Sequence, residues 1–303
     1  MGTAAASHSR GVGLPVQPGI PGVVPAVIAT AGILAAALAG IAFDTSAATV
    51  VACAAILMFG LPHGALDIEL IRVEGDGRLG VARILAVYLS IAGGVAALWL
   101  IAPVAALASF IIVAVVHFAD DWTDLPSRVL AGGLAGALIA APALLHRAAV
   151  AAIFVALTGS GGAARLADLL SSVAPAALAL AAVSLAWLIA AGRTRTAAAA
   201  AASLAALVVL PPVPGFAMFF CLFHSPRHFV AALQAARRWR VARWLPIVAP
   251  VTAAALAGVT LLFLRHGELA VSQRLTAATF MMLAILTMPH MLAPLALRRR
   301  AQP

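Results

Sequence analysis

The chain has 303 residues, of which 64% are hydrophobic and only 10% are charged. A soluble domain carries about 25% charged residues, so this composition excludes an ordinary soluble protein and indicates an integral membrane protein. The formal net charge is +9, and all 19 basic residues are arginine. Most of these arginines lie between apolar runs, as the positive-inside rule expects, so we exclude nucleic-acid binding as the reason for the charge.

The apolar runs predict an all-α fold, a polytopic transmembrane helix bundle of about ten spans, because each span needs roughly 20 apolar residues. We expect a disordered tail over residues 1–20, which are rich in Gly, Pro and Ser, then a single membrane-embedded catalytic domain over 21–297. Residues 298–303 form a short basic tail. The predicted spans, in chain order, are 22–43, 47–70, 81–102, 104–120, 129–145, 168–191, 196–211, 214–235, 244–264 and 274–296.

The segment 146–158 is apolar but short, which is typical of an interfacial or re-entrant helix. Ten spans place both ends of the chain on the same side of the membrane. With that side in the cytoplasm, most arginines fall in cytoplasmic connections. We therefore expect a multi-pass protein of the cell inner membrane with cytoplasmic N- and C-termini.

Five of the eight histidines fall inside the predicted spans, where a side chain that can become charged is costly and indicates a functional site. Imidazole is also a common ligand for transition metals. The predicted orientation puts all five in the inner halves of spans that run in the same direction, at similar depth. The sequence therefore predicts a buried metal centre formed from some or all of His63, His117, His224, His228 and His290.

Proline or glycine lies beside most of these histidines, at Pro62 with Gly64, at Pro226 and at Pro289. Proline removes a backbone donor, and non-helical backbone at membrane depth is tolerated where it is buried in protein or lines a cavity. We therefore expect several helices to be kinked or broken near the histidine cluster. Ser225 before Pro226 resembles a helix N-cap with a first-turn proline, which predicts two half-helices within 214–235.

His224 and His228 are four residues apart, which places two ligands on one face of a helix. Metal-bound histidine usually donates its second N–H to a carboxylate or a carbonyl group. The candidate carboxylates that lie near the histidines in the sequence are Asp67, Asp120 and Asp121. Asp67 has an alternative partner in Arg72.

Aromatic residues flank the histidines in the sequence. They are candidates to line an apolar substrate channel, although packing in the membrane core explains them equally well. These residues are Phe118, Trp122, Phe220, Phe223 and Phe229, with Phe219 beside them.

At these motifs the sequence resembles the Brp/Blh family of membrane-bound β-carotene 15,15'-dioxygenases. The matching pieces are Pro62-His63-Gly64 with Asp67, then His117-Phe118, then His224-Ser225-Pro226-Arg227-His228. The resemblance covers roughly residues 50–295. It implies a non-haem Fe(2+) held by His63, His117, His224 and His228. His290 is outside that set and is kept as a candidate that contacts the ligands.

The implied reaction is cleavage of the central 15,15' double bond of β-carotene by O₂ to give two all-trans-retinal molecules. Neutral imidazoles suit non-haem Fe(II), and four protein ligands leave coordination positions for O₂. The implied partners are β-carotene, O₂ and the lipid bilayer, and a rhodopsin is a candidate recipient of the retinal.

Two other classes of protein stay open. One is another membrane enzyme with a histidine-bound metal, such as a lipid desaturase or hydroxylase. Those enzymes resemble one another in having several histidine boxes, whereas this chain has a single His-x₃-His. The other is a non-enzymatic transporter or haem-carrying protein, because facing histidines could hold a haem.

Overall fold

The computed structural model describes the backbone of residues 22–65, 80–235 and 241–299. Every regular element in these ranges is helical, which confirms the predicted all-α class. Five stretches are long and apolar enough to cross a membrane, and four further apolar helices are shorter. The predicted N-terminal tail and most of the predicted C-terminal tail lie outside the described residues, and the single catalytic domain over 21–297 stays a prediction.

The helices follow the predicted spans closely. They are α1 Val23–Leu38, α2 Ser46–Ala65, α4 Val81–Ile101, α5 Pro103–Ala119, α6 Arg128–Thr158, α7 Ala164–Ala190, α8 Thr194–Val209, α9 Pro212–Phe219, α10 Ser225–Ala235, α11 Val241–Arg265 and α12 Val271–Arg299. Two short 3₁₀ turns, η1 Asp120–Trp122 and η2 Gly161–Ala163, precede α6 and α7. A π-helical turn, η3 Phe220–His224, joins α9 to α10.

Helix α6 differs from the sequence prediction because it joins the predicted span 129–145 to the segment 146–158. The two arms meet at a kink at His146, whose φ of −119° and ψ of 32° are not helical. The kink lies one turn after Pro142, which cannot donate a backbone hydrogen bond within the helix. Nε2 of His146 lies 3.3 Å from the carbonyl oxygen of Val209 at the end of α8, which ties the kink to a neighbouring helix. The segment 146–158 is therefore the second arm of one long helix.

The segment α9–η3–α10 also differs from the prediction of two half-helices. The chain remains helical through the π turn, and Ser225 has helical φ and ψ of −61° and −42°, so it is not an N-cap. A π turn is wider than an α turn and accommodates a residue such as Pro226 that has no N–H to donate. The Ser225 hydroxyl instead donates to the carbonyl oxygen of Phe59 in α2, at 2.5 Å.

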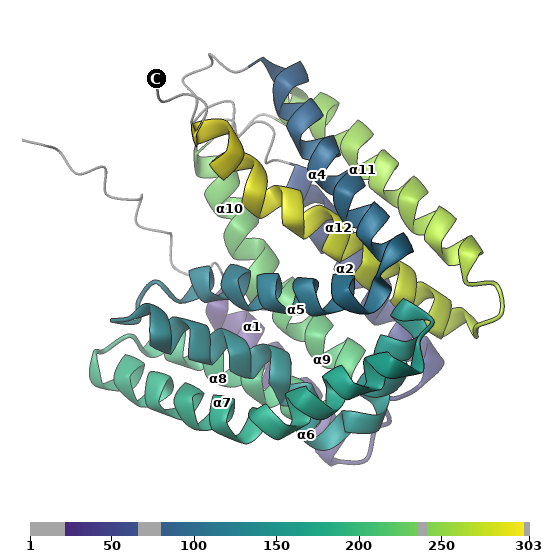
Figure 1. Cartoon of the computed structure of the whole chain (residues 1–303). Coiled ribbons are helices and arrows are strands. Elements are labelled where there is room, and N and C mark those ends of the chain that lie inside the picture. The colour runs from purple at the N-terminus through teal and green to yellow at the C-terminus, as the bar shows by residue number, and fades with distance from the viewer. Residues whose placement is uncertain (1–21, 66–79, 236–240, 300–303) are drawn as a thin grey trace, which may run out of the picture.

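Figure 1 shows how these helices surround the middle of the molecule. Helix α12 runs diagonally and contacts α4 and α11, which both lie to its right in this view, while α6 and α7 lie side by side on the opposite part of the molecule with α8. Helix α5 and the α9–α10 segment lie between these two groups. The helices that carry His117, His224 and His228 therefore meet in the interior.

Small residues let the helices approach closely, as is usual in membrane bundles. At Gly215 of α9 the close neighbour is another helix's backbone, since an added Cβ would lie 2.9 Å from the carbonyl oxygen of Ala206 in α8. Alanines supply much of the core that α6, α7 and α8 share with α5. This packing fixes the α9–α10 segment against the rest of the bundle.

Candidate metal centre

Three histidines meet in the interior of the protein. His117 lies in the last turn of α5, His224 ends the π turn η3, and His228 lies in the first turn of α10. One nitrogen from each can be chosen so that all three lie within 4.8 Å of one another. His117 and His224 are buried and His228 is partly buried. The structure therefore brings together three of the four histidines that the sequence proposes as ligands.

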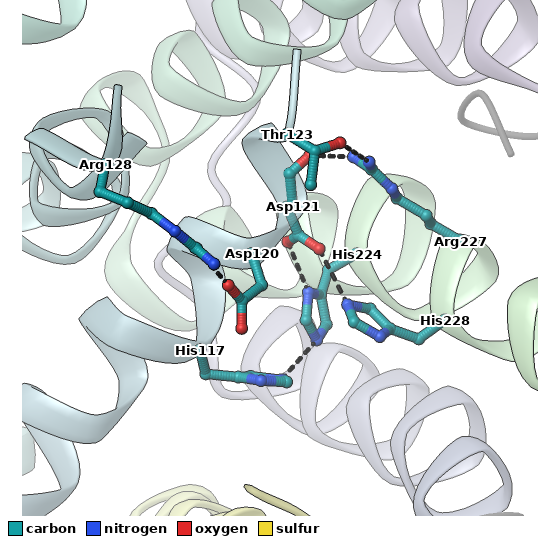
Figure 2. A network of polar contacts seen from close by, with 8 residues as sticks. All are labelled: His117, Asp120, Asp121, Thr123, Arg128, His224, Arg227 and His228. Carbon is teal, nitrogen blue, oxygen red and sulfur yellow. Dashed lines mark hydrogen bonds and ion pairs between the residues drawn. The ribbon is translucent and has the colours of Figure 1, made fainter. Parts of the chain in front are cut away.

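His117 and His224 face each other directly. Their Nε2 atoms are 3.2 Å apart, as the dashed line in Figure 2 shows. His228 follows His224 by four residues, and the centroids of these two rings are 4.5 Å apart. The spacing argument from the sequence is consistent with this geometry, although the first histidine of the pair belongs to a π turn.

Asp121 joins two of these histidines through one carboxylate. Its Oδ2 accepts a hydrogen bond from Nδ1 of His224 at 2.7 Å, and its Oδ1 accepts one from Nε2 of His228 at 2.8 Å (Figure 2). The side chain is almost fully buried, with 4% of its surface exposed. Asp121 follows His117 by four residues, a spacing that would place the two side chains on one face of a continuous α-helix. The 3₁₀ turn η1 instead turns Asp121 toward the helix that carries the other two histidines.

Asp120, the other candidate in this turn, pairs with an arginine. Its carboxylate forms an ion pair with Arg128 at 2.5 Å, and nearly half of its side-chain surface is exposed. Consecutive residues of a 3₁₀ turn point in different directions, so only one of two adjacent aspartates can face the cluster. The described contacts give Asp120 a different partner, Arg128 (Figure 2), so its predicted role beside the metal ligands stays a prediction.

Arg227, which lies inside the predicted span 214–235, supports the same turn. Its guanidinium donates to the backbone oxygen of Asp121 and also, at 3.4 Å, to the hydroxyl of Thr123. Only 6% of the residue is exposed. Its position between two histidines of one motif was the available signal, because an arginine inside a span must find buried acceptors.

His290 of α12 lies at the edge of the cluster. Its ring centroid is 5.1 Å from that of His117 and 6.3 Å from that of His228. The backbone of α2 runs through His63, but the side chain of His63 and all of Asp67 lie outside the described part of the structure. The predicted roles of His63 and Asp67 therefore stay predictions.

An apolar cavity ends at the histidines. His117, His224 and His290 are among the residues that line it, and its walls come from α2, α4, α5, α9, η3, α11 and α12. Of the proposed channel residues, Phe118 and Phe220 line it. The remaining lining residues are Gly60, Tyr88, Phe110, Ala114, Phe216, Val251, Ala255, Leu283, Leu286 and Thr287.

The other proposed channel residues have different positions. Trp122 and Phe223 are buried in the core cluster that α5 shares with α6, α7 and α8, and Phe219 lies with them. Phe229 is partly buried and is not among the residues that line the cavity. The helical register decides this division, because Phe220 and Phe223 lie on different faces of the same segment.

Aromatic rings line the cavity in a row that leads to the ligands. The ring of Phe216 stacks on that of Phe220, with 5.4 Å between centroids, and Phe220 stacks on His224 at 5.3 Å. Phe118 meets His224 edge-on at 4.9 Å. A flat, extended and apolar molecule would therefore find a continuous aromatic surface beside the histidines.

The cluster fits a metal ion held by imidazole ligands. Two nitrogens bound side by side to one ion, each through a bond of about 2.1 Å, lie about 3 Å apart, which matches the spacing of the two Nε2 atoms. Metal-bound histidine typically donates its other N–H to a carboxylate, as His224 does to Asp121. Imidazole ligands suit iron, zinc and copper, so the donor set is compatible with iron.

Fold and site together define a helical membrane protein with a histidine cluster at the end of an apolar cavity. The family model described as Beta-carotene 15,15'-dioxygenase matches residues 54–296 of the chain. The chain therefore belongs to the β-carotene 15,15'-dioxygenase family, which confirms the resemblance and the enzyme class inferred from the sequence.

Two relatives are similar along most of their length. The chain is 29% identical over 300 residues to the "Probable beta-carotene 15,15'-dioxygenase Blh" of Halobacterium salinarum, which covers 84% of this chain and 85% of the relative. It is 27% identical over 263 residues to the "Beta-carotene 15,15'-dioxygenase" of Uncultured marine bacterium 66A03, which covers 80% of this chain and 90% of the relative. No solved structure matches the chain.

Proposed function

We propose that this protein is an iron(II)-dependent, non-haem dioxygenase that cleaves the 15,15' double bond of β-carotene and releases two all-trans-retinal molecules. The observation that carries this proposal is the apolar cavity that ends on buried, mutually close histidines. Membership of the β-carotene 15,15'-dioxygenase family supports a carotenoid as the substrate. The proposed ligands are His117, His224 and His228, with His63 as the fourth.

The reaction balances without an external reductant. The carbon–carbon double bond and the oxygen–oxygen bond both break, and each of the two carbons receives one oxygen atom. Iron bound by the histidines would supply the position at which O₂ binds and is activated. The other side chains of the protein need only orient the histidine ligands, position the polyene and exclude water from the site.

The cavity residues suit these tasks. The stacked rings of Phe216 and Phe220 offer a flat apolar wall beside His224, against which the conjugated chain can lie. Tyr88 also lines the cavity, but its hydroxyl donates to the carbonyl of Leu286 at 3.3 Å, so a polar group there is satisfied within the protein. Such walls favour a hydrocarbon substrate and exclude water from the reacting bond.

The membrane supplies a route for this substrate. Apolar helices make the protein a membrane protein, and β-carotene dissolves in the hydrocarbon of the bilayer. We place the enzyme in the inner membrane of the cell with both termini in the cytoplasm, because that orientation puts most arginines on the cytoplasmic side. Retinal would leave by the same apolar route, and a rhodopsin is a candidate acceptor.

The geometry does not favour the haem alternative. Histidines on opposite sides of a haem iron have nitrogens about 4 Å apart, twice a bond of about 2 Å, with the macrocycle between them. Nε2 of His117 and Nε2 of His224 are only 3.2 Å apart and have no such gap. Ligands that share one side of an ion fit this spacing better.

Expression in a bacterium that accumulates β-carotene tests the proposal. We expect the cells to lose their orange colour and to form retinal, measured by chromatography, while cells with the His224→Ala variant stay orange. The purified protein should contain about one iron per chain, bound at the histidine cluster of the described residues. Cells that stay orange while they hold well-expressed, iron-loaded protein would contradict the proposed substrate.

A further inference from the structure

Both oxygens of the Asp121 carboxylate are used, one for each of two proposed ligands. Oδ2 accepts from Nδ1 of His224 and Oδ1 accepts from Nε2 of His228. An ionised carboxylate is only an acceptor, so each of these nitrogens carries a hydrogen. A neutral imidazole has one N–H and one lone pair, so the lone pair lies on Nε2 of His224 and on Nδ1 of His228.

We propose that Asp121 is a positioning residue that orients His224 and His228 together for one metal ion, an inference that rests on the proposed iron-dependent function. His224 then binds the ion through Nε2, the atom that already faces Nε2 of His117 at 3.2 Å. His228 binds through Nδ1. A single carboxylate thus sets the ring orientation and the binding nitrogen of two ligands at once.

The surroundings of Asp121 keep its carboxylate in place. Arg227 of α10 donates to the backbone oxygen of Asp121 itself. Three residues further on, Asp124 accepts a hydrogen bond from the hydroxyl of Thr196 in α8 at 2.6 Å.

On the other side of Asp121, Asp120 pairs with Arg128 at the start of α6. This ion pair is exposed and adds little. The contacts with α10 and α8 therefore hold the turn η1, so that Asp121 can impose an orientation on the histidines rather than follow them.

The Asp121→Asn substitution tests this role, and Asp120→Asn is the matched control. An amide has one acceptor oxygen and an NH₂ group, so it can accept from one imidazole N–H but presents a donor to the other. We expect Asp121→Asn to weaken iron binding by about 10- to 100-fold, the usual effect of removing a carboxylate behind a metal-bound histidine. Asp120→Asn should bind iron like the wild-type protein, because Asp120 faces Arg128.

Iron(II) affinity is measured without oxygen, by competition with a coloured chelator, on detergent-purified protein. The electron paramagnetic resonance spectrum of the nitric oxide adduct of iron-loaded protein is the second readout, and Asp121→Asn should alter it where Asp120→Asn does not. A folded Asp121→Asn protein with wild-type affinity and spectrum would overturn the proposal. Wild-type protein that binds iron but forms no retinal would instead overturn the proposed function.

Infrared spectroscopy on the wild-type protein keeps the inference testable if Asp121→Asn does not fold. Aspartate labelled with ¹³C identifies the carboxylate bands, and iron loading should shift one of them because the imidazoles bonded to Asp121 become metal ligands. Unchanged aspartate bands on loading would overturn the proposed role.

Discussion

Nε2 of His117 and Nε2 of His224 point at each other across 3.2 Å, although the two residues are 107 positions apart in the chain. Helix α5 brings the first to this point and the π turn η3 brings the second. Without an ion, one of these nitrogens can donate a hydrogen bond to the other. The same spacing suits two nitrogens that bind one metal ion side by side.

Removal of any one of the three proposed ligand imidazoles should prevent the metal ion from binding. We expect His117→Ala, His224→Ala and His228→Ala each to reduce bound iron and retinal formation to background, measured by elemental analysis and chromatography. His266→Ala is the matched control, because His266 lies in the turn between α11 and α12. An active His228→Ala variant would contradict the ligand assignment.

Phe220 and Phe223 belong to the same π turn, but the first lines the cavity and the second packs in the core cluster of α5, α6, α7 and α8. Both side chains are nearly buried, with 3% of Phe220 and 2% of Phe223 exposed, but only Phe220 lines the cavity and stacks on His224. We expect Phe220→Ala to lower retinal formation and to change the KM for β-carotene, in addition to lowering the melting temperature as the loss of a buried ring does. Phe223→Ala should mainly destabilise the fold, by about 3–5 kcal/mol, the usual loss for a buried phenylalanine.

Activity assays and thermal melting in detergent measure the two effects. If Phe223→Ala were the variant that changes the KM while Phe220→Ala only lowered the melting temperature, the cavity would be wrongly placed.

Gly60 leaves room for the Phe220 ring. A Cβ at this position would lie 3.0 Å from Cε1 of Phe220, closer than ordinary contact. We expect Gly60→Ala to push the ring into the cavity and to reduce turnover of β-carotene, at a cost of about 1–3 kcal/mol in stability from overpacking.

Gly94→Ala in α4 is the control, because nothing lies within 4 Å of an added Cβ there. It should keep full activity and gain a few tenths of a kcal/mol, up to about 1 kcal/mol, from helix propensity. Equal turnover by the two variants would show that Phe220 does not shape the substrate space.

Hydropathy and motif spacing predict the membrane spans and the histidine pair, but they do not predict which carboxylate contacts the histidines or which residues line the cavity. The spans were predicted well because length and apolarity alone define a membrane helix, and His224 and His228 were predicted as a pair because four residues span one helical turn. The choice between Asp120 and Asp121 depends on a 3₁₀ turn, which adjacent, identical residues do not reveal. The cavity wall from Tyr88 and Val251 depends on tertiary packing of α4 and α11 with α12, and no local pattern specifies it.

Ser225, which follows His224, links α10 to α2 at Phe59, one helical turn before His63. Its hydroxyl donates to the carbonyl of Phe59 at 2.5 Å, so it fixes α2 against α10. We expect Ser225→Ala to lower stability by about 1 kcal/mol, the net value of one such hydrogen bond, and to weaken iron binding, because α2 carries the proposed fourth ligand. Ser90→Ala is the control, since Ser90 is exposed and bonds only the carbonyl of Ala86 in its own helix. Thermal melting and chelator competition measure both variants, and identical iron affinities would contradict a role of α2 in the metal centre.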